Sequence, residues 1–564
     1  MRPKCYPSRL TVVKLVELFF KDYGNRLAPL LLDFTLKMPS NGLILKAHTY
    51  LIIGWILGLN FANAQTNPAP VNQIAPTDNR VILTPASPHS PQIHGPKIFG
   101  VRPGSPFLYS IPATGDRPMH FSADGLPGGL HLDESTGRIS GTLTSKGTFS
   151  VTLHARNSLG DSTRPFKIIA GDEIALTPPM GWNSWNCWHS GISQAKVLQS
   201  AHGLVNSGLA QHGWIYVNID DAWQGVRGGE LNAIQPNPKT FPDFPAMARE
   251  IHDMGLKLGI YSTPWVTSYA GHVGGSSENA EGTWDHATMT KGPKNKKILP
   301  FAIGSHHFFL NDAKQWAAWG VDYLKFDWAP IEPPETEEME NAIRASGRDI
   351  VFSLSNNATN SLFSVIPEVS KIGNSWRLGN DISDNWNSVV GNGFHHDQWA
   401  PYSHPGHWND PDMFEVGTNG GGTPKRLTAE EQYSHVSLWC LLSAPLLLGC
   451  DLDHLDDFTR GLLTNDEVID LDQDELGRQA TCVAKEGDCE VYAKPLADGS
   501  WAAGLFNLGK KETPVTVKWS DLGLSGQQMV RDLWRQKDVG LLADQFSAPV
   551  PSHGVVLIRI IPSN

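Results

Sequence analysis

The spacing of hydrophobic residues changes twice along the chain and separates three patterned regions. From about residue 96 to 171, apolar and polar residues alternate with a period of two between Gly, Asp and Asn turns, which is typical of a small β-sandwich. From about 177 to 475, short apolar runs alternate with segments of helical spacing, which is typical of β/α units. From about 480 to 562, strand-like segments return without helices. This last region predicts an antiparallel β-domain packed on the middle one.

The middle region predicts eight short strands with helical patterns between most of them. We expect the strands at 180–185, 216–223, 257–262, 323–328, 350–355, 374–381, 407–412 and 444–452. Helices are expected at 194–213 and 311–320, and at 428–442 with Thr428 as the N-cap. Eight β/α units in about 300 residues fit a (β/α)8 TIM barrel, and a doubly wound open sheet is the alternative. The barrel is favoured because polar residues gather at the ends of nearly all the strands, where a barrel carries its site.

The N-terminal region has the features of an export signal followed by a linker. An apolar run follows Lys46 and precedes an A-x-A motif at 62–64, which is the pattern of a signal peptide cleaved near Gln65. The run is short for a membrane span, so we expect export, with a retained anchor as the alternative. Because the signal lies deep in the chain, Met38 is a candidate for the true start. Residues 65–95 are rich in Pro, Asn, Thr and Ser and predict a linker.

Length, charge and cysteine content narrow the class of protein. A chain of 564 residues is too long for one core. We therefore expect a leader at 1–64, a linker at 65–95, an Ig-like β-sandwich at 96–171, a catalytic barrel at 172–478 and a C-terminal β-domain at 479–564. The net charge of -12 argues against a nucleic-acid partner. The six cysteines fit no metal-site spacing. Cys482 and Cys489 flank a predicted hairpin, where a disulfide and free thiols are both compatible with the sequence.

Polar and aromatic side chains concentrate at the ends of the predicted barrel strands. In strand order they are Trp182, Trp185, Asp220, Asp221, Tyr261, Lys325, Asp327, Arg377, Asp381, Trp408, Asp410 and Asp412. A single strand-end acid is usually structural, but several carboxylates at one rim repel each other unless a substrate or cations use them. Two positioned carboxylates between aromatic walls suit glycoside hydrolysis, in which one attacks the anomeric carbon and the other transfers a proton.

The spacing of these groups suggests how they work together. Lys325 lies two residues before Asp327, so both side chains point to the same face of the strand, where the cation keeps the carboxylate ionised. The adjacent Asp220 and Asp221 suit bidentate capture of neighbouring hydroxyl groups. The alternative is metal-assisted hydrolysis with the His-His-Asp stretch 395–397 as ligands. Adjacent loop histidines are more often solvated, and no H-E-x-x-H motif occurs, so we expect no metal and no cofactor.

Seven motifs in order resemble glycoside hydrolase family 27, the melibiase-type α-galactosidases, over residues 177–560. They are "LTPPMGWNSWNCW", "YVNIDDAWQG", "LKLGIYS", "WGVDYLKFDW", "WRLGNDISDNW", "HWNDPDMFEVG" and "LTNDEVIDLDQDELG". The resemblance implies a retaining mechanism with Asp327 as nucleophile and Asp381 as acid/base, ahead of the nearest competitor, Asp384. It implies these substrate-binding residues: Trp185, Asp220, Asp221, Tyr261, Lys325, Ser355 and Arg377. The segment 125–160 is similar to the Ig-like module of bacterial extracellular enzymes, whose default role is a spacer or docking module.

Three departures from the family pattern change what the resemblance implies. Well-studied members pair two cysteines near the ends of the third and fourth strands, whereas Trp265 and Trp328 stand there in this chain, so packing must hold the rim. An insertion at about 266–308 follows the third strand and is expected to be a lid over the sites beyond the cleaved sugar. Ser355 and Ala358 match relatives that accept N-acetylgalactosamine, where galactose-specific relatives have Glu and Leu.

The sequence therefore predicts a secreted or periplasmic, retaining exo-α-galactosidase acting on terminal α-D-galactosyl residues of oligosaccharides or glycans. Its two carboxyl groups should lie about 5–5.5 Å apart. The alternatives are an α-N-acetylgalactosaminidase of the same family and a non-catalytic carbohydrate-binding protein. The presence of both acids, Lys325 and Arg377 argues against the non-catalytic alternative. The short Asp220 and Asp221 leave space for the C6 hydroxymethyl group, which argues against the β-L-arabinopyranosidase branch. We expect no nucleic-acid partner and no membrane span in the mature chain, and the oligomeric state stays open.

Overall fold

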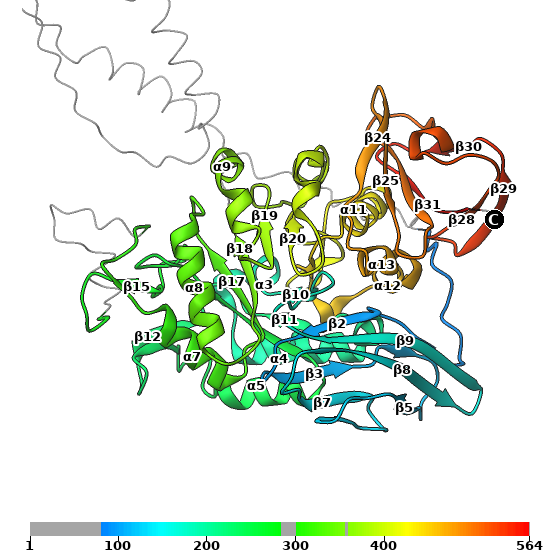
Figure 1. Cartoon of the computed structure of the whole chain (residues 1–564). Helices are drawn as coiled ribbons and strands as arrows, with labels where there is room; N and C mark the ends of the chain where they lie inside the picture. Colours follow the sequence, from blue (N-terminus) through cyan, green and yellow to red (C-terminus); the bar gives the residue numbers. More distant parts are fainter. Residues whose placement is uncertain (1–80, 284–300, 356–358, 563–564) are drawn as a thin grey trace, which may run out of the picture. The chain divides into compact units, whose positions relative to one another are not determined.

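The computed structural model describes residues 81–283, 301–355 and 359–562. The predicted leader, the candidate start Met38, the linker up to residue 80 and the charged stretch "KGPKNKK" at 291–297 lie outside the described residues. Within the described ranges, no helix combines the length and apolar character needed to cross a bilayer. Figure 1 shows the three folded regions in chain order, from blue through green to red.

The first folded region is a β-sandwich of two sheets, in which β2 pairs with β9 in parallel and the other strand pairs are antiparallel. One has the order β2-β9-β8-β5 and the other β3-β7-β6, and β1 pairs with β4. The bounds are Gln92–Ile93 (β1), Ile98–Val101 (β2), Pro106–Ser110 (β3), Ala113–Thr114 (β4), His120–Asp124 (β5), Leu130–Leu132 (β6), Arg138–Thr142 (β7), Gly147–Asn157 (β8) and Gly160–Ala170 (β9). Alternate residues of β8 and β9 are buried. The period-two pattern therefore packs one face of each strand into the sandwich core.

Eight parallel strands form one curled sheet in the order β20-β19-β18-β17-β14-β11-β10-β23. Their bounds are Met180–Asn183 (β10), Tyr216–Asn218 (β11), Lys257–Ser262 (β14), Tyr323–Asp327 (β17), Val351–Ser355 (β18), Ser375–Arg377 (β19), Trp408–Asp410 (β20) and Leu446–Leu448 (β23). Phe414, four residues after the end of β20, forms a parallel bridge with Leu448 of β23, so the sheet closes on itself. The predicted TIM barrel is confirmed, and each of the predicted strand segments contains one of these strands.

Helices connect the barrel strands on the outside of the sheet (Figure 1). The helices of this region are Trp185–Trp188 (α3), Gln194–Asn206 (α4), Phe244–Asp253 (α5), Phe309–Trp319 (α7), Pro333–Ala345 (α8), Thr359–Val369 (α9), Trp386–Gly393 (α10), Ala429–Leu442 (α11), Asp457–Leu463 (α12) and Asp466–Asp472 (α13). Thr428 caps α11 as predicted, because its Oγ1 accepts from the backbone N of Glu431 at 3.3 Å in a capping box. The predicted helix at 194–213 is shorter than expected and gives way to a 3-10 turn at Leu209–His212.

Three short antiparallel strand pairs lie in the described loops of the barrel. They are Gln224–Gly228 (β12) with Ala233–Pro236 (β13), Ser276–Ser277 (β15) with His306–His307 (β16), and Thr418–Asn419 (β21) with Thr423–Pro424 (β22). The pair β15–β16 belongs to the long insertion after β14. Its two strands bring the described beginning and end of that insertion together.

The C-terminal region is an antiparallel β-domain, as predicted. A sheet of order β24-β25-β26-β31-β28-β29 faces the pair β27–β30. The bounds are Thr481–Glu486 (β24), Cys489–Pro495 (β25), Trp501–Asn507 (β26), Thr513–Lys518 (β27), Gln528–Asp532 (β28), Lys537–Leu542 (β29), Gln545–Val550 (β30) and Val555–Pro562 (β31). Cys482 and Cys489 are both free thiols. In the β24–β25 ladder Cys482 faces Tyr492 and Cys489 faces Glu486, so the register does not bring the two thiols together.

The β-sandwich packs against the amino-terminal ends of the barrel strands. Ser110 Oγ donates to the carbonyl of Gly255, two residues before β14, at 3.0 Å. The backbone N of Arg102 donates to Asp349 Oδ2, two residues before β18, at 2.9 Å. Lys257 begins β14 and holds its ammonium 4.8 Å from the centre of the Phe99 ring. The opposite, carboxyl-terminal ends of the strands carry the predicted site residues.

Candidate active site

Asp327 is the last residue of β17 and is 7% exposed. The Tyr261 hydroxyl, on the neighbouring strand β14, donates to Asp327 Oδ2 at 2.9 Å. Within the described part of the chain, the buried Oδ1 has no hydrogen-bond partner. One carboxylate oxygen is therefore held by the protein, and the other makes no hydrogen bond to these residues.

Burial dominates the electrostatics of Asp327. The pKa of this carboxyl group is raised to about 7: burial is the largest cause, the Lys325 ammonium opposes the rise, and the nearby carboxylate of Asp220 adds to it. The sequence-based expectation that Lys325 favours the ionised form has the correct sign. It is incomplete, because the loss of solvation outweighs the cation, and the pKa of Asp327 ends above its ordinary value instead of below it.

Lys325 makes its direct ion pair with Asp220, which lies two residues after β11. Its Nζ lies 2.7 Å from Asp220 Oδ2, which also accepts from Asn183 Nδ2 at 2.9 Å. Asp220 Oδ1 accepts from the backbone N of Asp221 at 2.8 Å. Asn183 on β10 and Lys325 on β17 therefore fix the orientation of the Asp220 carboxylate, which follows β11. Asn183 was not among the predicted site residues, although its place at the end of β10 is the same signal that identified the others.

Asp221 is held by the insertion that follows β14. Its Oδ2 accepts from the backbone N of Ala270 at 2.8 Å, and its Oδ1 accepts from the backbone N of Ala222 at 2.7 Å. Burial raises the pKa of the Asp221 carboxyl group, and the Ala270 hydrogen bond opposes that rise. The first part of the predicted lid therefore touches the site directly. Its proposed role over the sites beyond the cleaved sugar stays a prediction, and residues 284–300 lie outside the described chain.

A buried ion pair fixes this insertion to the barrel. Arg227 holds Asp312 with Nη1–Oδ1 at 2.6 Å and Nη2–Oδ2 at 3.0 Å, and both side chains are at most 1% exposed. Arg227 Nη2 also donates to the carbonyl of Gly274 at 2.7 Å. Strand β12, helix α7 and the insertion thus meet at one guanidinium group, which holds the segment carrying Ala270 in place.

Arg377 organises the second carboxylate. Its Nη2 lies 3.2 Å from Asp381 Oδ1 and 3.0 Å from Asp412 Oδ2. The Asp381 side chain is 80% exposed, whereas Arg377 is buried. Asp412 Oδ2 also accepts from the backbone N of Ile382 at 2.8 Å. Asp412 therefore positions both Arg377 and the segment that carries Asp381, a role that its strand-end position did not reveal.

Asp384, the competitor for the acid/base role, has a different task. Its two carboxylate oxygens accept from the backbone N of Arg426 at 2.9 and 2.8 Å. A further bond from the backbone N of Leu427 reaches Oδ1 at 3.3 Å. This carboxylate connects the loop before α11 to the loop after β19, whereas Asp381 lies beside Arg377.

The remaining predicted residues take different places. Trp185 is half-buried at the start of α3, with its ring edge-on to His189 at 5.6 Å between ring centres. Ser355 ends β18 opposite Asp327 in the ladder, and its Oγ accepts from Arg377 Nη1 at 3.5 Å. Ala358 lies outside the described residues.

The two tryptophans in the cysteine positions are buried and pack against aromatic neighbours. Trp328 meets Phe326 edge-on at 5.0 Å, and Trp265 meets Tyr269 at 4.9 Å. The expectation that packing holds the rim agrees with these contacts.

The His-His-Asp stretch 395–397 does not gather into a ligand set. His395 Nε2 pairs with Glu490 Oε1 at 2.8 Å in the C-terminal domain. Asp397 Oδ1 accepts from the backbone N of Cys482 at 3.2 Å. These side chains connect the barrel to the C-terminal domain, so the metal-assisted alternative has no support from the described residues of this stretch.

Protein-family models match most of the described chain. The model described as "Alpha galactosidase A" matches residues 177–290 and 295–474. "Alpha galactosidase C-terminal beta sandwich domain" matches 486–560, and "Putative Ig domain" matches 90–170. The order of these three models agrees with the barrel, the C-terminal domain and the N-terminal sandwich.

Individual relatives point in the same direction. "Alpha-galactosidase 2" of Arabidopsis thaliana is 38% identical over 394 residues, which cover 69% of this chain and 90% of the relative. "Alpha-galactosidase" of Coffea arabica is 38% identical over 409 residues, covering 71% and 98%. The crystal structure of alpha-galactosidase I from Mortierella vinacea superposes with a TM-score of 0.59 at 28% identity, covering 70% of this chain and 99% of that one. A Bacteroides fragilis protein described as a "putative alpha-galactosidase" gives a TM-score of 0.75 at 32% identity, covering 84% and 98%.

Proposed function

Because the chain belongs to glycoside hydrolase family 27, the melibiase-type α-galactosidases, we propose that it removes terminal α-D-galactosyl residues from oligosaccharides or glycans. The proposed mechanism is retaining. Asp327 Oδ1 attacks the anomeric carbon while Asp381 donates a proton to the leaving oxygen, which gives a covalent β-galactosyl-enzyme. Asp381 then takes a proton from water, and this water releases galactose as the α-anomer. Two inversions at the anomeric carbon give net retention.

One observation carries these roles. Asp327 is buried with Oδ2 fixed by the Tyr261 hydroxyl, while Oδ1 makes no hydrogen bond within the described residues. A nucleophile needs this arrangement, because one oxygen holds the orientation and the other attacks. Asp381 is exposed beside the buried Arg377, and an acid/base residue at the mouth of a pocket can meet both the leaving group and the incoming water.

Azide rescue tests the two roles separately. Asp327→Ala and Asp381→Ala should each lose most activity on an aryl α-galactoside with a good leaving group, and azide should restore turnover in both. Rescue of Asp327→Ala should give β-galactosyl azide by a single inversion, whereas rescue of Asp381→Ala should give α-galactosyl azide by a double inversion. Asp384→Asn is the matched control, because its carboxylate binds backbone N–H groups. Near-wild-type rates in both Ala variants, or the same anomer from both, would contradict the assignment.

A second candidate substrate is a terminal α-N-acetylgalactosaminyl residue. The observation behind it is the small Ser355 side chain beside Asp327 and Arg377, where a long side chain would occupy the space. Hydrolysis of p-nitrophenyl α-galactoside and of p-nitrophenyl α-N-acetylgalactosaminide by one preparation decides between the two. Preference for the galactoside supports the proposed function, and preference for the acetamido sugar replaces it with the second candidate.

We also propose that the chain is exported to the periplasm or the medium. The proposal rests on the apolar run after Lys46 and the A-x-A motif at 62–64. N-terminal sequencing of the exported protein should begin near Gln65. A cell-retained protein that still carries this segment would contradict the proposal.

A further inference from the structure

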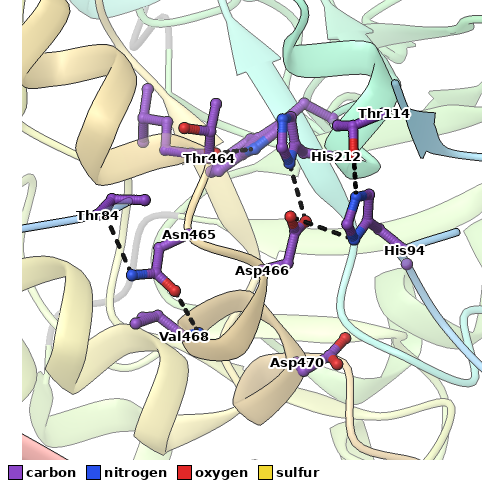
Figure 2. A network of polar contacts seen from close by, with 12 residues as sticks. Thr84, His94, Thr114, His212, Thr464, Asn465, Asp466, Val468 and Asp470 are labelled. Carbon is purple, nitrogen blue, oxygen red and sulfur yellow. Dashed lines mark hydrogen bonds and ion pairs between the residues drawn. The ribbon is translucent and has the colours of Figure 1, made fainter. Parts of the chain in front are cut away.

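Two histidines and an aspartate meet at the junction of the β-sandwich and the barrel, far along the chain from one another. His94 follows strand β1, His212 ends the 3-10 turn before β11, and Asp466 is the first residue of α13. Figure 2 shows both imidazole rings directed at the Asp466 carboxylate. His212 Nδ1 lies 2.8 Å from Asp466 Oδ1, and His94 Nδ1 lies 3.2 Å from Asp466 Oδ2.

The two rings are held in place by more than this carboxylate. They stack with 5.3 Å between their centres and 18° between their planes. His94 Nε2 lies 2.7 Å from Thr114 Oγ1, so the nitrogen opposite the carboxylate has its own partner (Figure 2). His94 and His212 are 7% and 5% exposed, and the Asp466 side chain is 18% exposed. The three groups are therefore preorganised, with access to solvent on the aspartate side.

We propose that His94, His212 and Asp466 bind one Zn²⁺ ion, which ties the β-sandwich to the barrel. Among the described residues, this is the group of His, Cys, Asp and Glu side chains whose ligand atoms converge, all within 4.8 Å of one another. Zinc prefers imidazole nitrogen and carboxylate oxygen at about 2.0–2.2 Å, which in a tetrahedral site places neighbouring ligand atoms about 3.3 Å apart. His212 Nδ1 lies 2.8 Å from Asp466 Oδ1 and His94 Nδ1 lies 3.2 Å from Asp466 Oδ2, so both imidazoles already lie near ligand–ligand distance from this carboxylate, and water would be the fourth ligand.

The surrounding groups fit a bound cation. On binding, each Nδ1 offers its lone pair to the metal and its proton moves to Nε2. In His94 the Nε2–H then donates a hydrogen bond to the Thr114 hydroxyl oxygen, as zinc-bound histidines do to their second-shell partners. The positive charge of Arg164 acts on His94 and Asp466. Its Nη2 lies 3.1 Å from Asp470 Oδ1 and also donates to the carbonyl of Gly95. Asp470 therefore offsets the charge of Arg164, and the carboxylate of Asp466 is left for the metal.

This site is separate from the catalytic one. His212 lies before β11, at the amino-terminal end of the barrel strands, whereas Asp220 and Asp327 lie at the carboxyl-terminal ends. We therefore expect zinc to stabilise the junction without taking part in hydrolysis. Since a metal that binds only the folded state stabilises it by mass action, the melting temperature should depend on zinc concentration.

Metal content and stability of the full chain test the proposal. The protein is stripped with a chelator, dialysed against Zn²⁺, and analysed for bound metal and melting temperature. Wild type should bind one zinc per chain and melt at a higher temperature with zinc than with chelator. His94→Gln and Asp466→Asn should lose both the bound ion and the zinc-dependent shift, while hydrolysing an aryl α-galactoside at the wild-type rate at low temperature.

His404→Gln is the matched control, because His404 is exposed beside another histidine, with 4.8 Å between the ring centres of His404 and His407. This variant should keep the bound ion and the shift. Cobalt substitution of the wild type gives a second readout that needs no variant, since a tetrahedral site produces intense visible absorption bands. The proposal is overturned if wild type binds no zinc after dialysis, if His404→Gln alone removes it, or if His94→Gln and Asp466→Asn destabilise equally with zinc and with chelator. That last result would mean that the cluster is a metal-free hydrogen-bonded clamp.

Discussion

Replacing Tyr261 with Phe removes a single oxygen atom from the active site and leaves the ring in place. The hydroxyl donates to Asp327 Oδ2 at 2.9 Å, in surroundings where both side chains are buried. Burial raises the pKa of Tyr261 well above its ordinary value, so this hydroxyl keeps its proton at any pH of an enzyme assay. A hydrogen bond to the ionised form of a carboxyl group lowers its pKa. Tyr261 thus opposes the rise that burial imposes on Asp327.

The size of the effect follows from the charge on the acceptor. A hydrogen bond to a charged group contributes about 1.5–3 kcal/mol, and one pKa unit corresponds to about 1.36 kcal/mol. Loss of the hydroxyl should raise the pKa of Asp327 by about 1–2 units, starting from about 7. Only the ionised carboxylate attacks, so kcat/KM declines as pH falls through this pKa. Below both values, Tyr261→Phe should be about 10- to 100-fold slower than wild type, and above them the two rates should converge.

The assay is the pH profile of kcat/KM on an aryl α-galactoside, because this ratio reports the ionisation of the free enzyme. Tyr433→Phe is the control for loss of a buried hydroxyl elsewhere, since that hydroxyl donates to the carbonyl of Val81 at 2.9 Å. Its profile should match the wild-type profile. If Tyr261→Phe loses activity by the same factor at every pH, with the acidic limb unmoved, then Tyr261 does not set the ionisation of Asp327 and the electrostatic argument fails.

Two further changes probe the charges around the site. Lys325→Met removes an ammonium group that lies 2.7 Å from Asp220 and that holds down the pKa of Asp327. We expect kcat to fall about 10²–10³-fold and the acidic limb of the pH profile to move to higher pH. An unmoved acidic limb would contradict this reasoning. Asp312→Ala leaves the buried Arg227 without its carboxylate, which should lower the free energy of unfolding by about 3–5 kcal/mol in urea titrations. Asp172→Ala is the control, because Asp172 forms an exposed ion pair with Lys146; it should leave the unfolding midpoint nearly unchanged. If Asp312→Ala and Asp172→Ala destabilise the protein equally, burial of the Arg227–Asp312 pair does not set its contribution to stability.

The barrel strands could be predicted from the sequence because strands covered on both faces give continuous apolar runs. The segment 257–262 coincides with β14, all of whose residues after Lys257 are buried. The segment 374–381 was predicted too long, because β19 ends at Arg377 and the chain then turns into the loop of Asp381. A strand-end motif shows which segment contains a strand, but hydrogen bonding with the neighbouring strands decides at which residue the strand ends.

Partners within the site were harder to predict than its members. The spacing of Lys325 and Asp327 placed both side chains on one face, yet the ion pair forms with Asp220 from another strand, a choice set by barrel geometry. The backbone N of Ala270 that holds Asp221 carries no sequence signal at all, because every non-proline residue has one. The raised pKa of Asp327 likewise depends on how deeply the strand end is buried, which a motif does not state.

The contacts at the amino-terminal end of the barrel argue against a mere spacer role for the β-sandwich. A spacer needs few contacts with its neighbour. Here Asp349 accepts a hydrogen bond from the backbone N of Arg102, and the Lys257 ammonium lies 4.8 Å from the centre of the Phe99 ring. Removing the sandwich would leave these half-buried barrel groups without their partners, and losing such partners destabilises a fold. The same contacts place the sandwich at the end of the barrel opposite the catalytic carboxylates. Any glycan that the sandwich binds would therefore be held away from Asp327, so we expect its removal to change the stability of the barrel rather than the binding of substrate beside Asp327.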